Sequence, residues 1–248
     1  MAIANCDIKS LSRQNSKTGS LRNICSAVAY RSGEKLRSIE DEEIKYPHRN
    51  TNDIEHNFML NNPYGSRQEL WNEVEKAELK KDRTIKDNPC WAREVLIAIP
   101  KELSIEQRIN LVEDYGKQIA EKYNVAVDST LYTEKNGNGN FYALILITTR
   151  NVINGALGKK DRQFNGNEAK KTIFDFRNTW EETTNKHLEN AGKSERISLQ
   201  RVDKNREYKN IHHYGNPELI QENERRKNLE EQNNISKELK ILNSNKNG

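Results

Sequence analysis

The chain has 248 residues, 33% of them apolar and 31% charged, with a net charge of +4 and a mean hydropathy of −1.02. A chain of this length can form one hydrophobic core of ordinary size and still have an additional segment outside it. The polar composition means that a good part of the residues must be exposed to solvent. No signal-peptide pattern and no apolar run near ~20 residues occur, so we expect a cytoplasmic protein without a membrane segment.

The N-terminal stretch is basic and is predicted to hold a strand and a helix. Seven cationic and two anionic side chains fall between residues 1 and 39. Apolar and polar residues alternate from Ala2 to Lys9, which predicts a half-buried strand. From Ser20 to Ser32 apolar residues recur at helical spacing, and Gly33 follows as a C-terminal cap.

The next part of the chain combines an irregular stretch with a strand and a helix. Residues 37–53 are charged and irregular, whereas Ile54 to Leu60 is predicted to be a short strand that carries His56. Ser66 and Glu69 have the spacing of a capping box, which predicts the start of a helix.

A second strand and a second capped helix follow. Ala92 to Pro100 reads as a strand that the proline ends. Ser104 and Gln107 form another capping box. The predicted buried stripe of that helix is Ile105, Ile109, Val112, Gly116, Ile119 and Tyr123.

A hairpin is predicted in the middle of the chain, over Leu131 to Arg150. Asn136 to Asn140 is rich in Asn and Gly, which tolerate positive φ in tight turns. The second arm, Phe141 to Thr149, is apolar on both faces. Such a strand belongs in the centre of a sheet that is covered on both sides.

The remainder is predicted to be a basic loop, a long helix and a charged tail. The loop follows Arg150 and contains Lys159, Lys160 and Arg162. The helix has an apolar stripe at three- and four-residue steps, on which His187 is expected to be a hydrogen-bonded core histidine.

Residues 197–215 read as an extended basic segment. Residues 216–248 form a separate charged tail, either helical or disordered, so the main domain is predicted to span residues 1–215.

Five short stretches of the chain have distinctive sequences. They are SAVAYRSGEKL at 26–36, WNEVEKAELKKD at 71–82, AREVLIAIP at 92–100, NFYALILITTR at 140–150 and HYG at 213–215. Together they resemble motifs of the MobA/MobL family of plasmid mobilization relaxases and bracket most of the predicted domain. The resemblance implies an α+β fold, a relaxase-like antiparallel β-sheet with helices packed on it.

The resemblance also implies site residues and partners. Tyr30 matches the family tyrosine that attacks a DNA phosphodiester, and Glu94 matches one of two glutamates near the active site, so both are predicted catalytic residues. The expected partner is single-stranded or origin-of-transfer DNA, together with other mobilization proteins. The predicted DNA-binding residues are Arg22, Arg31, Lys35, Lys159, Lys160 and Arg162.

The metal ligands of the family pattern are replaced in this sequence. Tyr132, Tyr142 and Leu144 stand where the family places three metal-binding histidines, and Leu96 stands at the second glutamate. The match at Tyr132 depends on the length of the hairpin turn. Leucine has no donor atom and a phenol has a pKa near 10. We therefore predict an apolar patch without a metal, and Mg²⁺ or Mn²⁺ as a cofactor only if nicking is retained.

Other residues offer weak support for a rebuilt metal site. The three cysteines lack C-x-x-C spacing, which argues against a thiolate site or a disulfide framework and indicates reduced packing residues. No H-x-H occurs in the chain. A rebuilt site would need distant histidines to converge in space, and the candidates are His48, His56, His212 and His213.

Three functions remain open from the sequence. The protein is a relaxase that nicks a transfer origin through Tyr30, or a catalytically inactive pseudo-relaxase that acts as a DNA-binding or regulatory module. The third possibility is an interaction scaffold in which residues 216–248 are the working part.

Overall fold

The structure, a computed structural model, describes residues 5–14, 19–47, 51–82, 84, 86, 89–133, 141–164 and 166–199. Residues 1–200 form one compact unit. The boundary predicted after Gly215 and the tail predicted for residues 216–248 lie outside the described residues. The helices and strands are β1 (Cys6–Ser12), α1 (Ile24–Ser32), β2 (Leu36–Arg37), β3 (Ile44–Lys45), η1 (Thr51–Asp53), β4 (Ile54–Leu60), α2 (Arg67–Lys76), β5 (Cys90–Ile99), α3 (Ile105–Tyr123), β6 (Val125–Thr133), β7 (Phe141–Ile153), β8 (Ala156–Lys160), η2 (Arg162–Phe164) and α4 (Glu168–Asn190).

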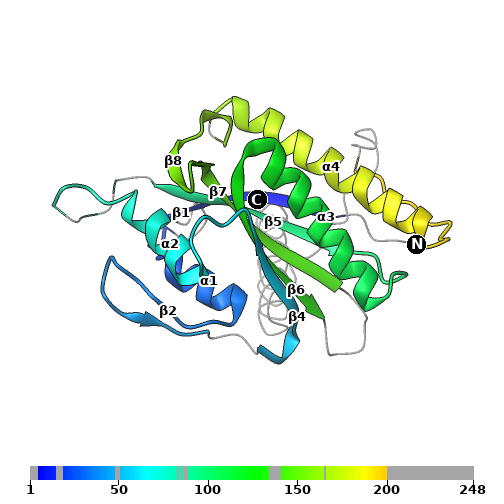
Figure 1. The fold of residues 1–248 in the computed structure, drawn as a ribbon, viewed down its shortest axis with the longest axis horizontal. Helices are drawn as coiled ribbons and strands as arrows, with labels where there is room; N and C mark the ends of the chain where they lie inside the picture. The colour runs from blue at the N-terminus through cyan, green and yellow to red at the C-terminus, as the bar shows by residue number, and fades with distance from the viewer. Residues whose placement is uncertain are drawn as a thin grey trace, which may run out of the picture. The chain divides into compact units, whose positions relative to one another are not determined.

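An antiparallel sheet with the strand order β1-β5-β7-β6-β4 forms the centre of the fold, and β8 pairs with β7 (Figure 1). β7 lies in the middle of this order, as its apolar composition predicted. The register places Val95 of β5 and Ser129 of β6 on either side of Ile145. Because side chains alternate across a strand, this register determines which residues share a face. The predicted α+β class, an antiparallel sheet with packed helices, is confirmed.

One face of the sheet is covered by α3 and α4. Ile97 of β5 and Ile147 of β7 are fully buried there, together with Tyr115 of α3 and Trp180 of α4. The rings of Tyr115 and Trp180 meet edge to face, with 5.3 Å between their centroids. Burying an apolar side chain of this size contributes about 1.5–3 kcal/mol, so this layer is a main source of stability.

The helix α3 follows its predicted buried stripe except at its first residue. Val112 and Ile119 are buried as predicted. Gly116 is buried where α3 approaches β4, and a Cβ there would lie 2.8 Å from Leu60 Cδ1, so a larger residue would require the Leu60 side chain to shift. The prediction for Ile105 was wrong, because burial begins one turn later and this side chain is 56% exposed.

The opposite face of the sheet is covered in part by α1 and α2. Val28 of α1 and Trp71 of α2 are fully buried in a second apolar cluster. That cluster includes Ala92, near the start of β5, and Leu146, near the middle of β7. α1 is therefore anchored on the sheet by its apolar side, and its last turn lies beside β6, as the contacts below show.

Local helix signals in the sequence correspond to the observed helix ends. Ser66 and Glu69 bond reciprocally at the start of α2, and Ser104 and Gln107 do so at the start of α3. Gly33 follows α1 with φ of 76°, the left-handed conformation that glycine adopts without a steric penalty.

Two stretches predicted as loops contain strands. The chain does not leave the sheet after Arg150, because β7 continues to Ile153 and returns as β8. The turn is made by Asn154 and Gly155, whose φ angles of 49° and 74° suit a tight hairpin. Residues 37–53 contain β3, which pairs with the two residues of β2. The first strand is observed from Cys6 to Ser12, where it pairs with β5, and residues 2–4 of the predicted strand lie outside the described residues.

The three thiols are free, and Cys6 and Cys25 are buried. Burial raises the pKa of the Cys6 thiol to about 12. Burial, together with the neighbouring Glu75 carboxyl, raises the pKa of Cys25, and burial raises that of Cys90.

Cys6 is therefore expected to resist alkylation in the native protein. A rise in pKa from 9.0 to about 12 lowers the thiolate fraction at pH 8 by about a thousandfold, and thiolate is the reactive form. Iodoacetamide labelling at pH 8, followed by peptide mass spectrometry, should be slower by that order in native protein than in guanidinium. Equal rates in both solutions would contradict the burial of Cys6.

Candidate nucleic-acid interface

Tyr30 and Arg31 lie in the last turn of α1 and point in different directions. Consecutive helical residues project about 100° apart. The Tyr30 side chain is 45% exposed, so it is not the packed core aromatic that a lone tyrosine at a helix end usually is. Arg31 faces the sheet, because it lines a tight crevice between α1 and the sheet together with Leu144. Tyr30 is not among the residues of that crevice.

Arg31 holds the carboxylate of Glu94. Its Nε donates to Glu94 Oε2 at 2.7 Å, and its Nη2 donates to the same oxygen. Its Nη1 donates to the carbonyl oxygen of Ala27 at 2.5 Å. The two charged side chains are 18% and 17% exposed, so the pair is shielded from bulk solvent. The structure thus brings together the predicted DNA-binding Arg31 and the predicted catalytic Glu94.

The four positions that depart from the family pattern adjoin on one face of the sheet. Tyr132 on β6 pairs with Tyr142 on β7, and Leu144 pairs with Leu96 on β5. The rings of Tyr132 and Tyr142 stack with 5.0 Å between centroids and 18° between planes. Tyr132 is fully buried and its Oη donates to the carbonyl oxygen of Arg31. Tyr132 is therefore a direct neighbour of Tyr142 on this face of the sheet.

The donor set at this place does not fit a divalent metal. Two of the four side chains are leucines, which have no donor atom for a metal. The hydroxyl of the buried Tyr132 donates a hydrogen bond to the Arg31 carbonyl. The Glu94 carboxylate is neutralised by the Arg31 guanidinium. Among the described residues, no group of three or more His, Cys, Asp or Glu side chains is placed to hold a metal ion.

The described histidines have other contacts. His56 on β4 lies 3.9 Å from Glu113 of α3, and its ring is tilted against that of Phe58. His187 on α4 bonds to Asp114 at 2.9 Å, which confirms its predicted hydrogen bonding, but its side chain is 17% exposed, so it is not the core residue that was predicted. The other three candidates, His48, His212 and His213, lie outside the described residues.

The remaining predicted basic residues are spread over the molecule. Lys35 is exposed just after α1 and lies 5.2 Å from the Tyr46 ring. Arg22 lies just before the N-terminal end of α1, and its backbone N–H bonds to the Arg13 carbonyl. The other three are on β8 and η2, near the far end of β7. Because Lys160 pairs with Arg150, eight residues beyond Tyr142, it lies roughly 27 Å along the strand from the aromatic pair. These three are Lys159, Lys160 and Arg162.

A buried charge network next to α1 was not predicted. Arg67 of α2 donates through Nε and Nη2 to Asp128 of β6 at 2.9–3.0 Å, and Trp71 Nε1 donates to the same carboxylate at 2.8 Å. Arg67 Nη1 also pairs with Glu34, which follows α1. The signal in the sequence was a single acidic residue inside the otherwise uncharged, buried strand β6.

The run WNEVEKAELKKD contains two further buried carboxylates. Glu75 is fully buried and accepts bonds from the Asn23 side chain at 3.0 Å, Ser38 Oγ at 2.9 Å and the Ile39 N–H at 2.6 Å. Asn23 caps the start of α1, so Glu75 ties that helix to α2. Glu78 binds Arg150 at 2.6 Å. This run therefore positions the elements around the interface.

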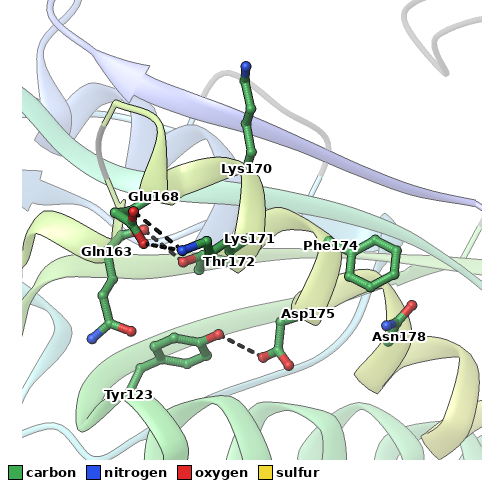
Figure 2. A pocket seen from close by; sticks show the side chains of 9 residues that line it. All are labelled: Tyr123, Gln163, Glu168, Lys170, Lys171, Thr172, Phe174, Asp175 and Asn178. Carbon is green, nitrogen blue, oxygen red and sulfur yellow. Dashed lines mark hydrogen bonds and ion pairs between the residues drawn. The ribbon is translucent and has the colours of Figure 1, made fainter.

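A hollow of about 570 Å³ lies elsewhere, along α4 (Figure 2). Tyr123 Oη donates to Asp175 Oδ2 at 2.7 Å on its floor. Burial and the Asp175 carboxylate raise the pKa of Tyr123. Lys171 and Glu168 pair beside them at 3.2 Å. None of the predicted site residues lines this hollow.

The sequence and the fold were compared with known proteins. The model of the MobA/MobL family matches residues 22–217. Mobilization protein MobL of Acidithiobacillus ferridurans is 28% identical over 230 residues, which are 79% of this chain and 57% of that protein. The chain thus spans just over half the length of this curated relative.

The fold is similar to that of a solved structure. A chain described under the molecular basis of vancomycin resistance transfer in Staphylococcus aureus superposes with a TM-score of 0.65 at 23% identity, covering 81% of this chain and all of that one. A MobM relaxase domain bound to plasmid oriT DNA gives a TM-score of 0.39 at 14% identity, over 81% of this chain and 93% of that domain. In the described part of this chain, no helix has the length and apolar character that crossing a bilayer requires.

Proposed function

The chain belongs to the MobA/MobL family, and from this premise we propose that it is a plasmid mobilization protein that binds single-stranded DNA of a transfer origin. The observation that carries the proposal is the end of α1. There the exposed Tyr30 precedes Arg31, whose backbone carbonyl accepts a hydrogen bond from Tyr132 of an aromatic pair on the sheet. The name of the MobL relative supports the same process.

The chemistry of this surface suits a single strand. Proteins bind single-stranded DNA with cations that follow the phosphates and aromatic rings on which bases stack. Arg31 and the exposed Lys35 supply cations, and the half-buried Tyr142 supplies a ring. The distant cluster on β8 and η2 would contact DNA that extends away from this point.

DNA binding should weaken steeply as salt is raised. Each phosphate contact to a single strand contributes about −0.7 to the slope of log affinity against log salt concentration. Replacing Lys35 by alanine should make the slope shallower by about that amount, measured by fluorescence anisotropy with a labelled origin oligonucleotide. Lys171→Ala, on the exposed side of α4, is the matched control and should leave the slope unchanged. Absence of binding at low salt would overturn the proposal.

Strand cleavage by Tyr30 is the second candidate function, and the exposure of this phenol favours it. The phenol oxygen would bond to phosphorus while the bond from phosphorus to a sugar oxygen breaks, which leaves DNA covalently attached to the protein. Denaturing gels of the protein with origin DNA and Mg²⁺ or Mn²⁺ test this step. An adduct that disappears in Tyr30→Phe supports cleavage. No adduct with the unmodified protein removes this candidate and leaves a binding module.

A further inference from the structure

Strand β4 forms one edge of the central sheet, since within the described sheet it pairs with β6 alone. An open hollow of about 660 Å³ lies beside this edge and is lined by residues 57–59 of β4 and by the loop that leads into α2. We propose that this hollow is a docking site for an extended, basic peptide segment of a partner protein, which adds a strand to the sheet beside β4. The inference does not depend on the proposed DNA binding.

The backbone of β4 has hydrogen-bonding groups that are open to an added strand. In an antiparallel pair, alternate residues direct their N–H and C=O groups toward the neighbouring strand, and the residues between them direct theirs away. Residues 57–60 pair with residues 127–130 of β6 without a register shift, so two of these four residues direct their backbone groups to the edge. Within the described part of the chain, no backbone group outside the β4–β6 pair bonds to them. An extended peptide supplies the matching donors and acceptors.

The two halves of β4 differ in how the edge is protected. Natural proteins blunt edge strands with charged side chains and with β-bulges. The first half of β4 has both, because Glu55 is left unpaired where the register shifts. Residues 57–60 have no charged side chain and no bulge. The half of the strand that is open to pairing is therefore the half that borders the hollow.

The wall of the hollow opposite β4 is held in place by its own hydrogen bonds. The Asn62 side chain accepts from the Tyr64 N–H at 3.0 Å and donates to the Ser66 carbonyl at 3.3 Å. The Asn61 side chain donates to the Val125 carbonyl at 3.1 Å, which ties the loop to β6. A wall that is fixed before binding loses little conformational freedom when a peptide docks.

The charge around the hollow favours a basic segment. Arg67 and Glu34 are its two charged lining residues. The Arg67 guanidinium is 5% exposed, and the buried Asp128 carboxylate balances its charge. Glu34 is 48% exposed and is the second carboxylate on the same guanidinium, so a net negative charge remains at the rim. A lysine or arginine of the docked segment can pair with Glu34, whereas an acidic segment or a nucleic-acid phosphate would be repelled.

The hollow adjoins α1 but does not include the residues proposed for DNA. Glu34 directly follows Gly33, the C-terminal cap of α1. Tyr30, Arg31 and Lys35 are not among the lining residues. A partner that is docked at β4 would therefore be held next to the helix that carries Tyr30 without occupying the candidate DNA contacts.

The first measurement is the fluorescence anisotropy of a labelled octapeptide of alternating valine and lysine, titrated with the full chain. We expect saturable binding with a dissociation constant of about 10–100 µM. The same peptide methylated on all its backbone nitrogens should bind about tenfold more weakly, because it cannot donate to the edge. A valine–glutamate octapeptide should not bind. Since the chain has a net charge of +4, general electrostatic attraction does not favour the lysine peptide.

Amide hydrogen exchange locates the bound peptide. A saturating concentration of the lysine peptide should slow exchange in residues 54–60, because the added strand covers the open edge. Residues 6–12 of β1, which form the opposite edge of the described sheet, are the matched control and should exchange at an unchanged rate.

Two variants test the role of the charge at the rim. Glu34→Gln should weaken binding of the lysine peptide by about threefold. Glu168→Gln also removes an exposed carboxylate from an ion pair, but on α4, and should bind like the unmodified chain. Thermal unfolding shows whether each variant keeps the fold.

Several results would overturn the inference. These are no binding of the lysine peptide, equal binding of the methylated peptide, slowed exchange in β1 in place of β4, and equal affinity of Glu34→Gln. A dimer that protects residues 54–60 without any peptide would also overturn it, because the edge would then belong to a second copy of this chain.

Discussion

Replacing Asp128 with alanine is expected to lower the free energy of unfolding by about 3–5 kcal/mol. The Arg67 guanidinium is nearly inaccessible to water and places two of its nitrogens on this carboxylate. The Trp71 indole N–H uses the same acceptor. Without Asp128, a buried cation and a buried donor lose their partner together, and the Glu34 carboxylate at the rim compensates only in part. Urea denaturation followed by tryptophan fluorescence measures the loss.

Two further variants separate charge from shape at this network. Asp128→Asn keeps the volume and one acceptor oxygen, so its loss should be smaller than that of alanine. The double variant Arg67→Met with Asp128→Leu replaces the ion pair by apolar side chains and removes the uncompensated charge, so it should be more stable than Asp128→Ala alone. A loss under about 1 kcal/mol for Asp128→Ala would contradict the assigned network.

The network also fixes the place of the candidate interface. Arg67 contacts Glu34 directly after Gly33, where α1 ends. The same α1 is tied at its start to Glu75 of α2 through Asn23. Both ends of this short helix are therefore held by α2, through Arg67 at one end and Glu75 at the other.

Features that depend on neighbouring residues could be predicted from the sequence. A capping box joins residues three apart, so Ser66 with Glu69 was recognisable without knowledge of the fold. Gly33 as a helix end and the central position of β7 depend on backbone conformation and composition alone. The hairpin turn at Asn154 and Gly155 carried an equally local signal, and the prediction of a loop there missed it.

Features that join distant parts of the chain could not be predicted in this way. The bond between Glu75 and Ser38 spans 37 residues, and that between Arg67 and Asp128 spans 61. Nothing in the composition of either segment indicates its partner. The Arg31–Glu94 pair was named residue by residue, but their contact became evident only from the packing of α1 on β5. The sheet register likewise separates Lys160 from the aromatic pair.

Introducing three histidines on this face of the sheet should create a metal site where the described residues of the unmodified chain form none. Tyr132 and Tyr142 are directly paired, and Leu144 lies two residues along β7 on the same face. Three imidazoles in this arrangement, with one position open, suit Zn²⁺. We expect the triple variant Tyr132→His, Tyr142→His and Leu144→His to bind one Zn²⁺ per chain, measured by calorimetry. At a Zn²⁺ concentration 100 times the dissociation constant, the ion should add about 2.7 kcal/mol to the free energy of unfolding.

The matched control keeps Leu144 and carries only the two tyrosine substitutions. Two imidazoles on paired strands leave the ion with a weaker donor set, so Zn²⁺ should stabilise this variant much less. Adding Arg31→Ala to the triple variant should strengthen Zn²⁺ binding, because it removes a positive charge that adjoins the site through the Tyr132 hydroxyl contact in the unmodified chain. If the triple variant folds and shows no more Zn²⁺ stabilisation than the control, then these positions do not face a common point, and the assignment of the replaced ligands fails.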